Sequence, residues 1–119
     1  MRVQNISAVT FAVRDMARAI DFYKTVGFTL VHGSEEDPFA TLQGGDAYVN
    51  LALRPEYEER WWGRTIFRVD SADTLHAELV AQGVACDPPR DAAWGERYFH
   101  VRDPDGHELS FAEVVQQQS

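Results

Sequence analysis

Apolar and polar residues alternate from Ile6 to Val13, a pattern that predicts a half-buried strand. Asp15 follows as a good helix N-cap, apolar residues then recur at helical spacing, and Gly27 supplies a left-handed stop. Turn-rich stretches separate the three strands predicted next, which are Phe28–His32, Phe39–Gln43 and Ala47–Leu53. The first half of the chain is therefore predicted to be a βαβββ module.

The second half repeats this order. Thr65, Phe67 and Val69 form a strand face, Asp70 or Ser71 can cap a helix, and Gly83 ends it. The three strands predicted after this helix are Val84–Cys86, Arg97–Arg102 and Glu108–Val114.

A common offset relates the two halves. Val13 and Val69 are 56 residues apart, and so are Gly27 and Gly83. Such an offset indicates an internal duplication. We expect one α+β domain spanning 1–119, made of modules at about 1–56 and 61–115 that are joined by the charged segment 54–60.

The turn Asp103-Pro104-Asp105-Gly106 predicts the pairing of the last two strands. Proline in second place and glycine in fourth suit a type I turn followed by a left-handed glycine, which is a three-residue hairpin with a bulge. Counting from Asp103 opposite His107 then pairs Arg102 with Glu108, His100 with Ser110 and Tyr98 with Ala112. These side chains should share one face of the sheet.

The formal net charge of −8 argues against a nucleic-acid partner, which would require clustered Lys and Arg. It fits either a cationic small molecule drawn in by the field or an acidic surface that only keeps the protein soluble. Cys86 is the single cysteine, no apolar run is long enough for a membrane span, and the N-terminus lacks a signal-peptide core. We expect a cytoplasmic protein without a membrane partner.

The duplication, together with Phe22-Tyr23, Gly27-Phe28 and Trp94-Gly95 leading to Asp103-Pro104-Asp105-Gly106, resembles the vicinal-oxygen-chelate superfamily. This superfamily includes glyoxalase I, extradiol dioxygenases and bleomycin-resistance proteins. The resemblance covers the chain from Ile6 to about Val114 and implies a curved mixed sheet around a cleft. Function does not follow from it, because one scaffold hosts lyases, isomerases, dioxygenases and drug binders.

The resemblance also assigns four positions that hold the metal in the metal-dependent enzymes. They are occupied here by Ala8, Asn50, Arg64 and Ser110. Alanine has no donor, arginine is a permanent cation, and the other two are weak neutral oxygens. We therefore expect no metal and no other cofactor, although a displaced metal site using His100 and Glu108 stays an alternative.

Strand alternation predicts which side chains face the cleft. The ligand-binding candidates are Tyr48, Asn50, Trp62, Arg64, Trp94, Tyr98, His100, Glu108 and Ser110, with Ile66 and Arg68 beside them. Rings with a few convergent polar groups are typical of a small-molecule pocket.

Several of these candidates have a plainer interpretation. His100 is either a hydrogen-bonded partner of Ser110 or a general base, and Arg64 either pairs with Glu108 or binds an anion. Trp61 is interpreted as filler of a core or interface, and His32, His76 and His107 as surface residues.

Two classes of function remain. One is a metal-free protein that sequesters an aromatic or cationic compound, as the resemblance to bleomycin-resistance proteins, and hence antibiotic resistance, implies. The other is an enzyme of the lyase, isomerase or dioxygenase type that uses His100 and Arg64 without the usual metal. We favour binding and expect a homodimer, while the pairing of modules within one chain or across two stays open.

Overall fold

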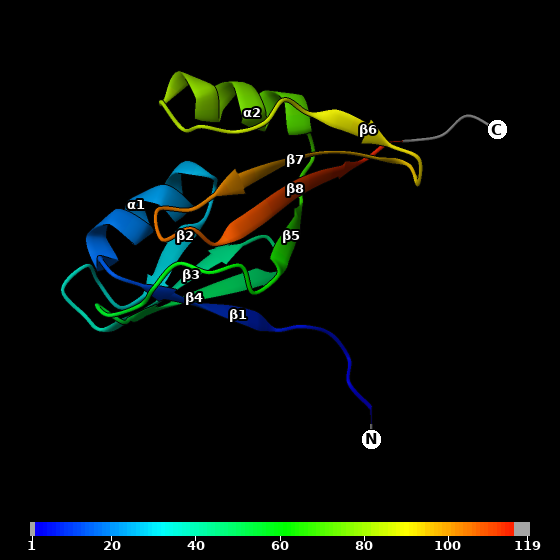
Figure 1. Cartoon of the computed structure of the whole chain (residues 1–119). Helices are drawn as coiled ribbons and strands as arrows, with labels where there is room; N and C mark the ends of the chain where they lie inside the picture. Colours follow the sequence, from blue (N-terminus) through cyan, green and yellow to red (C-terminus); the bar gives the residue numbers. More distant parts are fainter. Residues whose placement is uncertain (1, 116–119) are drawn as a thin grey trace. The chain divides into compact units, whose positions relative to one another are not determined.

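The computed structural model describes residues 2–115, and the chain divides between Glu59 and Arg60 into two compact units. Each unit has the element order β-α-β-β-β and one four-stranded mixed sheet (Figure 1). The α+β class with two βαβββ repeats is therefore confirmed. Within the described range no helix is long and apolar enough to cross a membrane.

The first unit has the sheet order β1-β4-β3-β2, with β1 parallel to β4 and the remaining pairs antiparallel. Its elements are β1 (Ala8–Val13), α1 (Met16–Thr25), β2 (Thr29–His32), β3 (Phe39–Gly44) and β4 (Ala47–Leu53). As predicted, Asp15 caps α1 by accepting a hydrogen bond from the backbone of Arg18. Tyr23 on α1 stacks against Phe11 of β1 with ring centroids 5.7 Å apart, which fixes the helix on the sheet.

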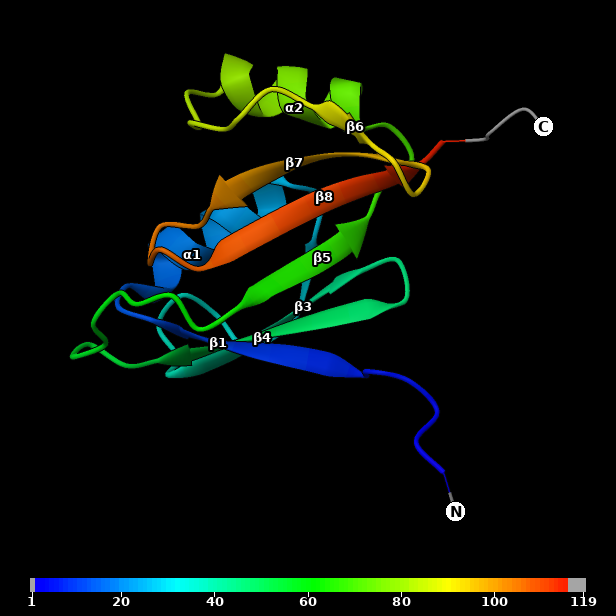
Figure 2. The ribbon, with the colours of Figure 1, turned by 45° about the vertical axis from the view of Figure 1, so that its right-hand side comes forward.

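The second unit repeats this arrangement as β5-β8-β7-β6. Its elements are β5 (Arg64–Arg68), α2 (Ala72–Ala81), β6 (Arg90–Ala92), β7 (Glu96–Arg102) and β8 (Glu108–Val114). Figure 2 shows α2 lying over one face of this sheet. Leu79 of α2, Phe99 of β7 and Phe111 of β8 are fully buried, so this face forms the core of the unit.

The predicted strand Val84–Cys86 is wrong. Cys86 makes only an isolated bridge to Val101, and the edge strand is β6, which begins at Arg90. Pro88 and Pro89 explain the difference, because proline has no N–H to donate to a strand ladder. The chain therefore runs irregularly past β7 before it pairs with that strand.

The predicted turn between β7 and β8 is confirmed together with its register. Asp103 is buried, and its Oδ1 accepts 2.9 Å hydrogen bonds from the backbone N–H groups of Asp105 and His107. Gly106 has a φ of 88°, the left-handed conformation that the bulge requires. The pairs Tyr98–Ala112, His100–Ser110 and Arg102–Glu108 follow as counted.

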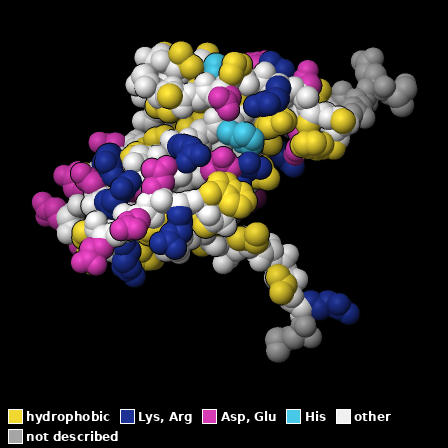
Figure 3. All heavy atoms as spheres, in the orientation of Figure 1, with side chains coloured by type: hydrophobic (Ala, Val, Ile, Leu, Met, Phe, Trp, Pro, Cys, Tyr) yellow, Lys and Arg dark blue, Asp and Glu magenta, His cyan; other side chains and the backbone are white. Residues whose placement is uncertain are grey.

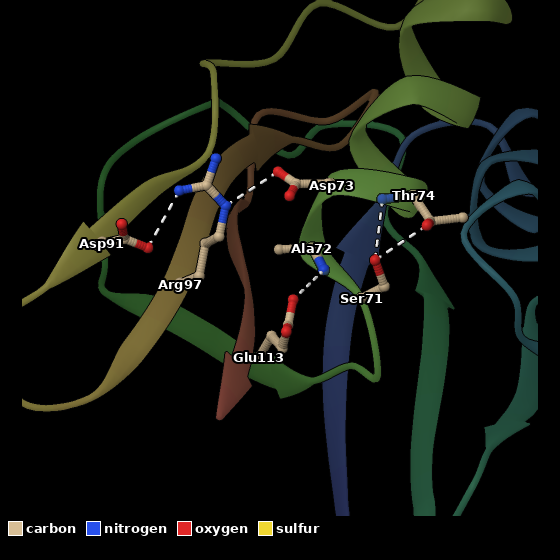
Figure 4. Close-up of polar contacts among 7 residues, drawn as sticks. All are labelled: Ser71, Ala72, Asp73, Thr74, Asp91, Arg97 and Glu113. Atoms are coloured by element: carbon tan, nitrogen blue, oxygen red, sulfur yellow. Dashed lines mark hydrogen bonds and ion pairs between the residues drawn. The ribbon is translucent and has the colours of Figure 1, made fainter. Parts of the chain in front are cut away.

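Polar contacts tie α2 to the sheet at its N-terminus (Figure 4). Ser71 caps the helix through the backbone of Thr74, and Glu113 of β8 accepts a 2.9 Å hydrogen bond from the N–H of Ala72. Arg97 of β7 bridges two carboxylates, Asp73 at 2.9 Å and Asp91 at 3.1 Å. The contacts of Ser71 and Glu113 satisfy helix N–H groups that have no partner within the helix.

Replacing Glu113 tests this anchor. Glu113→Ala leaves the Ala72 N–H without its carboxylate, so we expect the free energy of unfolding to fall by about 1–2 kcal/mol. Glu78→Ala, an exposed glutamate on the same helix, should change it by less than about 0.5 kcal/mol. Urea denaturation followed by circular dichroism measures both, and equal effects would contradict the anchoring role.

Candidate ligand-binding face of the second sheet

The β7–β8 register gathers most of the predicted site residues on one face of the second sheet. Phe99, Leu109 and Phe111 fill the α2 side, so the alternating residues of β7 and β8 point away from the helix. β5 runs parallel to β8 and pairs with it at Arg64–Glu108 and Ile66–Ser110. The residues brought together are Arg64, Ile66, Trp94, Tyr98, His100, Glu108 and Ser110.

Three rings form what we call the aromatic patch: Trp94, Tyr98 and His100. Trp94 and Tyr98 stack nearly parallel with centroids 6.1 Å apart, and the rings of Tyr98 and His100 are 5.3 Å apart. The guanidinium of Arg90 lies 5.6 Å from the Tyr98 centroid, within cation–π range. Trp94 is 71% exposed although it is part of this stack. The patch is therefore an ordered aromatic surface open to a ligand.

Two hollows flank His100. A shallow one of about 120 Å³ lies over Trp94, Tyr98 and Ser110. A larger pocket of about 540 Å³ is bounded by the segment 84–87, by His100 and by Glu108. We call the larger one the Cys86 pocket. Because His100 lines both, one ligand could contact both hollows.

The arginines of this face are paired with carboxylates. Nε of Arg64 lies 2.6 Å from Oε2 of Glu108, which also accepts a 3.3 Å hydrogen bond from Trp61. Burial raises the pKa of Glu108, but the hydrogen bonds from Arg64 and Trp61 outweigh it, and the net pKa lies below its usual range. Of the two roles expected for Arg64, the geometry supports structural pairing.

Glu96 plays a similar part next to the patch. Its Oε1 accepts a 2.6 Å hydrogen bond from the Trp94 indole, and its Oε2 lies 3.8 Å from Arg68. Sequence reasoning missed this residue, although its position two residues before Tyr98 places both on the same side of β7.

His100 has a polar atom without a partner. Its Nδ1 is buried and makes no hydrogen bond, so the expected hydrogen-bonded pair with Ser110 does not form through this atom. Burial and the positive charge of Arg64 lower the pKa of His100, partly opposed by Glu108. The imidazole is therefore neutral at neutral pH, and among residues 2–115 no hydrogen bond at Nδ1 fixes its tautomer.

Three other predictions need correction. His107, expected at the surface, is only 2% exposed, because Trp62 covers it and donates a 2.8 Å hydrogen bond to its Nδ1. Trp62 thus lies against the turn, with its Nε1–H engaged by His107. Trp61, expected to fill a core or interface, is 68% exposed and therefore lies outside the core of its unit, while its role in an interface stays a prediction. His76 is half-buried with its ring 5.3 Å from that of Phe99, whereas His32 is exposed as expected.

Tyr48 and Asn50 lie on β4 of the first unit. Asn50 belongs to a chain of hydrogen bonds across three strands: its Oδ1 accepts from Thr41 at 2.7 Å, and its Nδ2 donates to Thr10 at 3.3 Å. Both ends of this amide are therefore engaged within the first sheet.

The residues at the family's metal positions do not form a ligand set. Ala8 offers no side-chain donor, the Asn50 amide is already hydrogen-bonded, and Arg64 is a cation paired with Glu108. Among residues 2–115 no three His, Cys, Asp or Glu side chains cluster as a metal site would need. These donors do not fit a divalent cation.

Two substitutions should move the pKa of His100 in opposite directions. Arg64→Met removes the neighbouring positive charge, so the pKa should rise. Glu108→Gln removes the carboxylate that favours the protonated ring, so the pKa should fall further. Titration of the imidazole C–H resonance by NMR measures each change, and shifts of the same sign would contradict the assigned charges.

Comparison with known proteins places this fold in a family. The model of the Glyoxalase/Bleomycin resistance protein/Dioxygenase superfamily matches residues 5–111. A bleomycin resistance protein from Geobacillus stearothermophilus is 29% identical, covering 95% of this chain and 98% of the relative.

Solved structures agree on the fold. The bleomycin resistance determinant encoded on transposon Tn5 has a TM-score of 0.80 at 20% identity, covering 95% of this chain and 100% of that one. The fosfomycin resistance protein FosX from Mesorhizobium loti has a TM-score of 0.77 at 23% identity, covering 96% and 95%. The chain belongs to the glyoxalase/bleomycin resistance protein/dioxygenase superfamily.

Proposed function

We propose that this protein binds a small aromatic compound, without a metal, on the face of its second sheet. The observation that carries the proposal is the aromatic patch, in which two stacked rings lie beside a hollow with polar groups. A planar ligand gains stacking and area burial there at little ordering cost, since the rings are already aligned. The relatives described as bleomycin resistance proteins support a drug-like ligand.

The sequence left open that Arg64 binds an anionic ligand, but the structure gives Arg64 a smaller influence on the charge of the ligand. Arg64 and Arg68 each have a carboxylate partner, so neither offers an unpaired cation to an anion. The net charge of −8 favours a cation at long range. Acidic and basic side chains are interspersed on the surface in Figure 3, which limits this field. An aromatic compound that is neutral or weakly cationic therefore suits the face best.

A second candidate function is catalysis by His100. The observation in its favour is the neutral imidazole of His100, which lines both hollows and could accept a proton from a bound ligand. No carboxylate orients this ring, as one usually does for a histidine base, and so binding without turnover is the preferred function.

Calorimetric titration with bleomycin tests the proposal. We expect saturable binding that is the same in the presence of a chelator, and ligand recovered unchanged. Trp94→Ala should weaken binding about 5- to 150-fold, the range for losing an aromatic anchor. Val80→Ala, an exposed apolar residue on α2, should have no effect.

An anionic control, naphthalene-2-sulfonate, should bind more weakly than bleomycin. Tighter binding of the sulfonate, lost in Arg64→Ala, would show that the arginine sets the preference. Turnover of either compound that disappears in His100→Ala would replace the binding function by an enzymatic one. The absence of binding by both compounds would contradict the proposal.

We also propose a homodimer. In each sheet the two outer strands leave backbone N–H and C=O groups without a strand partner among the described residues, and such edges favour association. Sedimentation velocity at micromolar concentration should give about twice the chain mass of 13.5 kDa. A single species at the chain mass, at all concentrations, would contradict it.

A further inference from the structure

Equivalent positions in the two modules hold different kinds of side chain. In the first sheet, Thr10, Thr41 and Asn50 form a closed chain of hydrogen bonds across β1, β3 and β4. The same pairing positions in the second sheet hold Ile66 and His100 on either side of Ser110. Ile66 has no hydrogen-bonding group and is 63% exposed. The polar chain of the first module is therefore not reproduced in the second.

This difference leaves Nδ1 of His100 buried and without a hydrogen-bond partner among residues 2–115. A rotation of the ring about the Cβ–Cγ bond, which breaks no hydrogen bond at this atom, would bring it toward a ligand. An unsatisfied buried polar atom costs free energy, which a ligand that brings a hydrogen-bonding group can recover.

The Cys86 pocket is the space in which such a group can lie. It extends from His100 to the irregular segment 84–87, where Pro88 and Pro89 delay the edge strand. Its charged lining residues are Asp87, Arg102 and Glu108. Asp87 pairs with Arg90 at 3.9 Å and Glu108 with Arg64 at 2.6 Å. Burial and Asp87 raise the pKa of Cys86, so its thiol stays protonated and unreactive.

The aromatic patch and the Cys86 pocket meet at His100. The Tyr98 and His100 ring centroids are 5.3 Å apart, so a ligand ring that contacts Tyr98 would lie beside the imidazole. A short side arm on that ring would therefore reach His100. The carboxylates that line the pocket, Asp87 and Glu108, are each paired with an arginine. An ammonium would therefore find no unpaired carboxylate there, and a neutral hydroxyl is the better end group.

We propose that the Cys86 pocket receives a hydroxyl group on the side arm of an aromatic ligand, and that this hydroxyl hydrogen-bonds to the His100 imidazole. The inference rests on the proposed function, because the ring of the ligand occupies the aromatic patch. It defines the ligand class as an aromatic alcohol rather than any planar compound.

The test compares 2-(2-naphthyl)ethanol with its methyl ether, which keeps the ring and arm but has no O–H to donate. We expect the alcohol to bind about 3- to 10-fold more tightly, the equivalent of one net hydrogen bond. The imidazole ¹⁵N resonances of His100 should move with the alcohol and not with the ether. The corresponding amine should bind more weakly than the alcohol.

Three substitutions distinguish the contribution of the Cys86 pocket to binding from that of the aromatic patch. His100→Phe keeps a ring but no nitrogen, and should abolish the preference for the alcohol while ring binding remains. Ala85→Phe, which fills the pocket from an exposed position, should do the same. His32→Phe, at an exposed histidine of β2, should leave the preference intact.

The failure of this inference differs from the failure of the proposed function. If alcohol and ether bind equally, and Trp94→Ala weakens both, the hydroxyl site is wrong and the aromatic site stands. If neither compound binds, or if Trp94→Ala changes nothing, the proposed function itself is contradicted.

Discussion

The Asp103 carboxylate holds the turn on which the whole candidate face depends. Oδ1 accepts two backbone hydrogen bonds within the turn, and Gly106 closes the bulge in the left-handed conformation. Because side chains alternate along a strand, a slip of one residue would exchange the two faces of the hairpin. His100 and Tyr98 would then point toward α2, and Phe99 would be exposed. One buried carboxylate thus determines which residues of the hairpin lie in the core and which lie on the candidate face.

Pairing of charges determines what this face can recognise. Glu108 and Glu96 engage the arginines beside them, and Glu96 also holds the Trp94 indole. The arginines therefore add structure rather than free positive charge, and in the proposed function the exposed rings are the main source of affinity. His100 lines both hollows, and its buried Nδ1 has no hydrogen-bond partner among residues 2–115.

Much of this could be predicted from the sequence, because local rules applied. The repeat at 56 residues, the Asp15 cap and the turn at Asp103 specified the modules and the β7–β8 register. Predictions failed where the chain folds back on itself. The strand register predicts which face His107 occupies. It does not predict that Trp62, from another segment of the chain, covers this histidine. Nor does alternation reveal that Pro88-Pro89 displaces the edge strand and leaves a pocket beside Cys86.

The central claim is that an aromatic compound binds on the second-sheet face, at Trp94 and Tyr98. Chemical-shift mapping of uniformly ¹⁵N,¹³C-labelled protein during titration with 2-(2-naphthyl)ethanol tests it most directly. The account predicts saturable shifts concentrated on the rings of Trp94, Tyr98 and His100. Shifts concentrated instead on α2 or on the helix-covered face of either sheet would contradict it. The absence of shifts at saturating ligand would contradict it too.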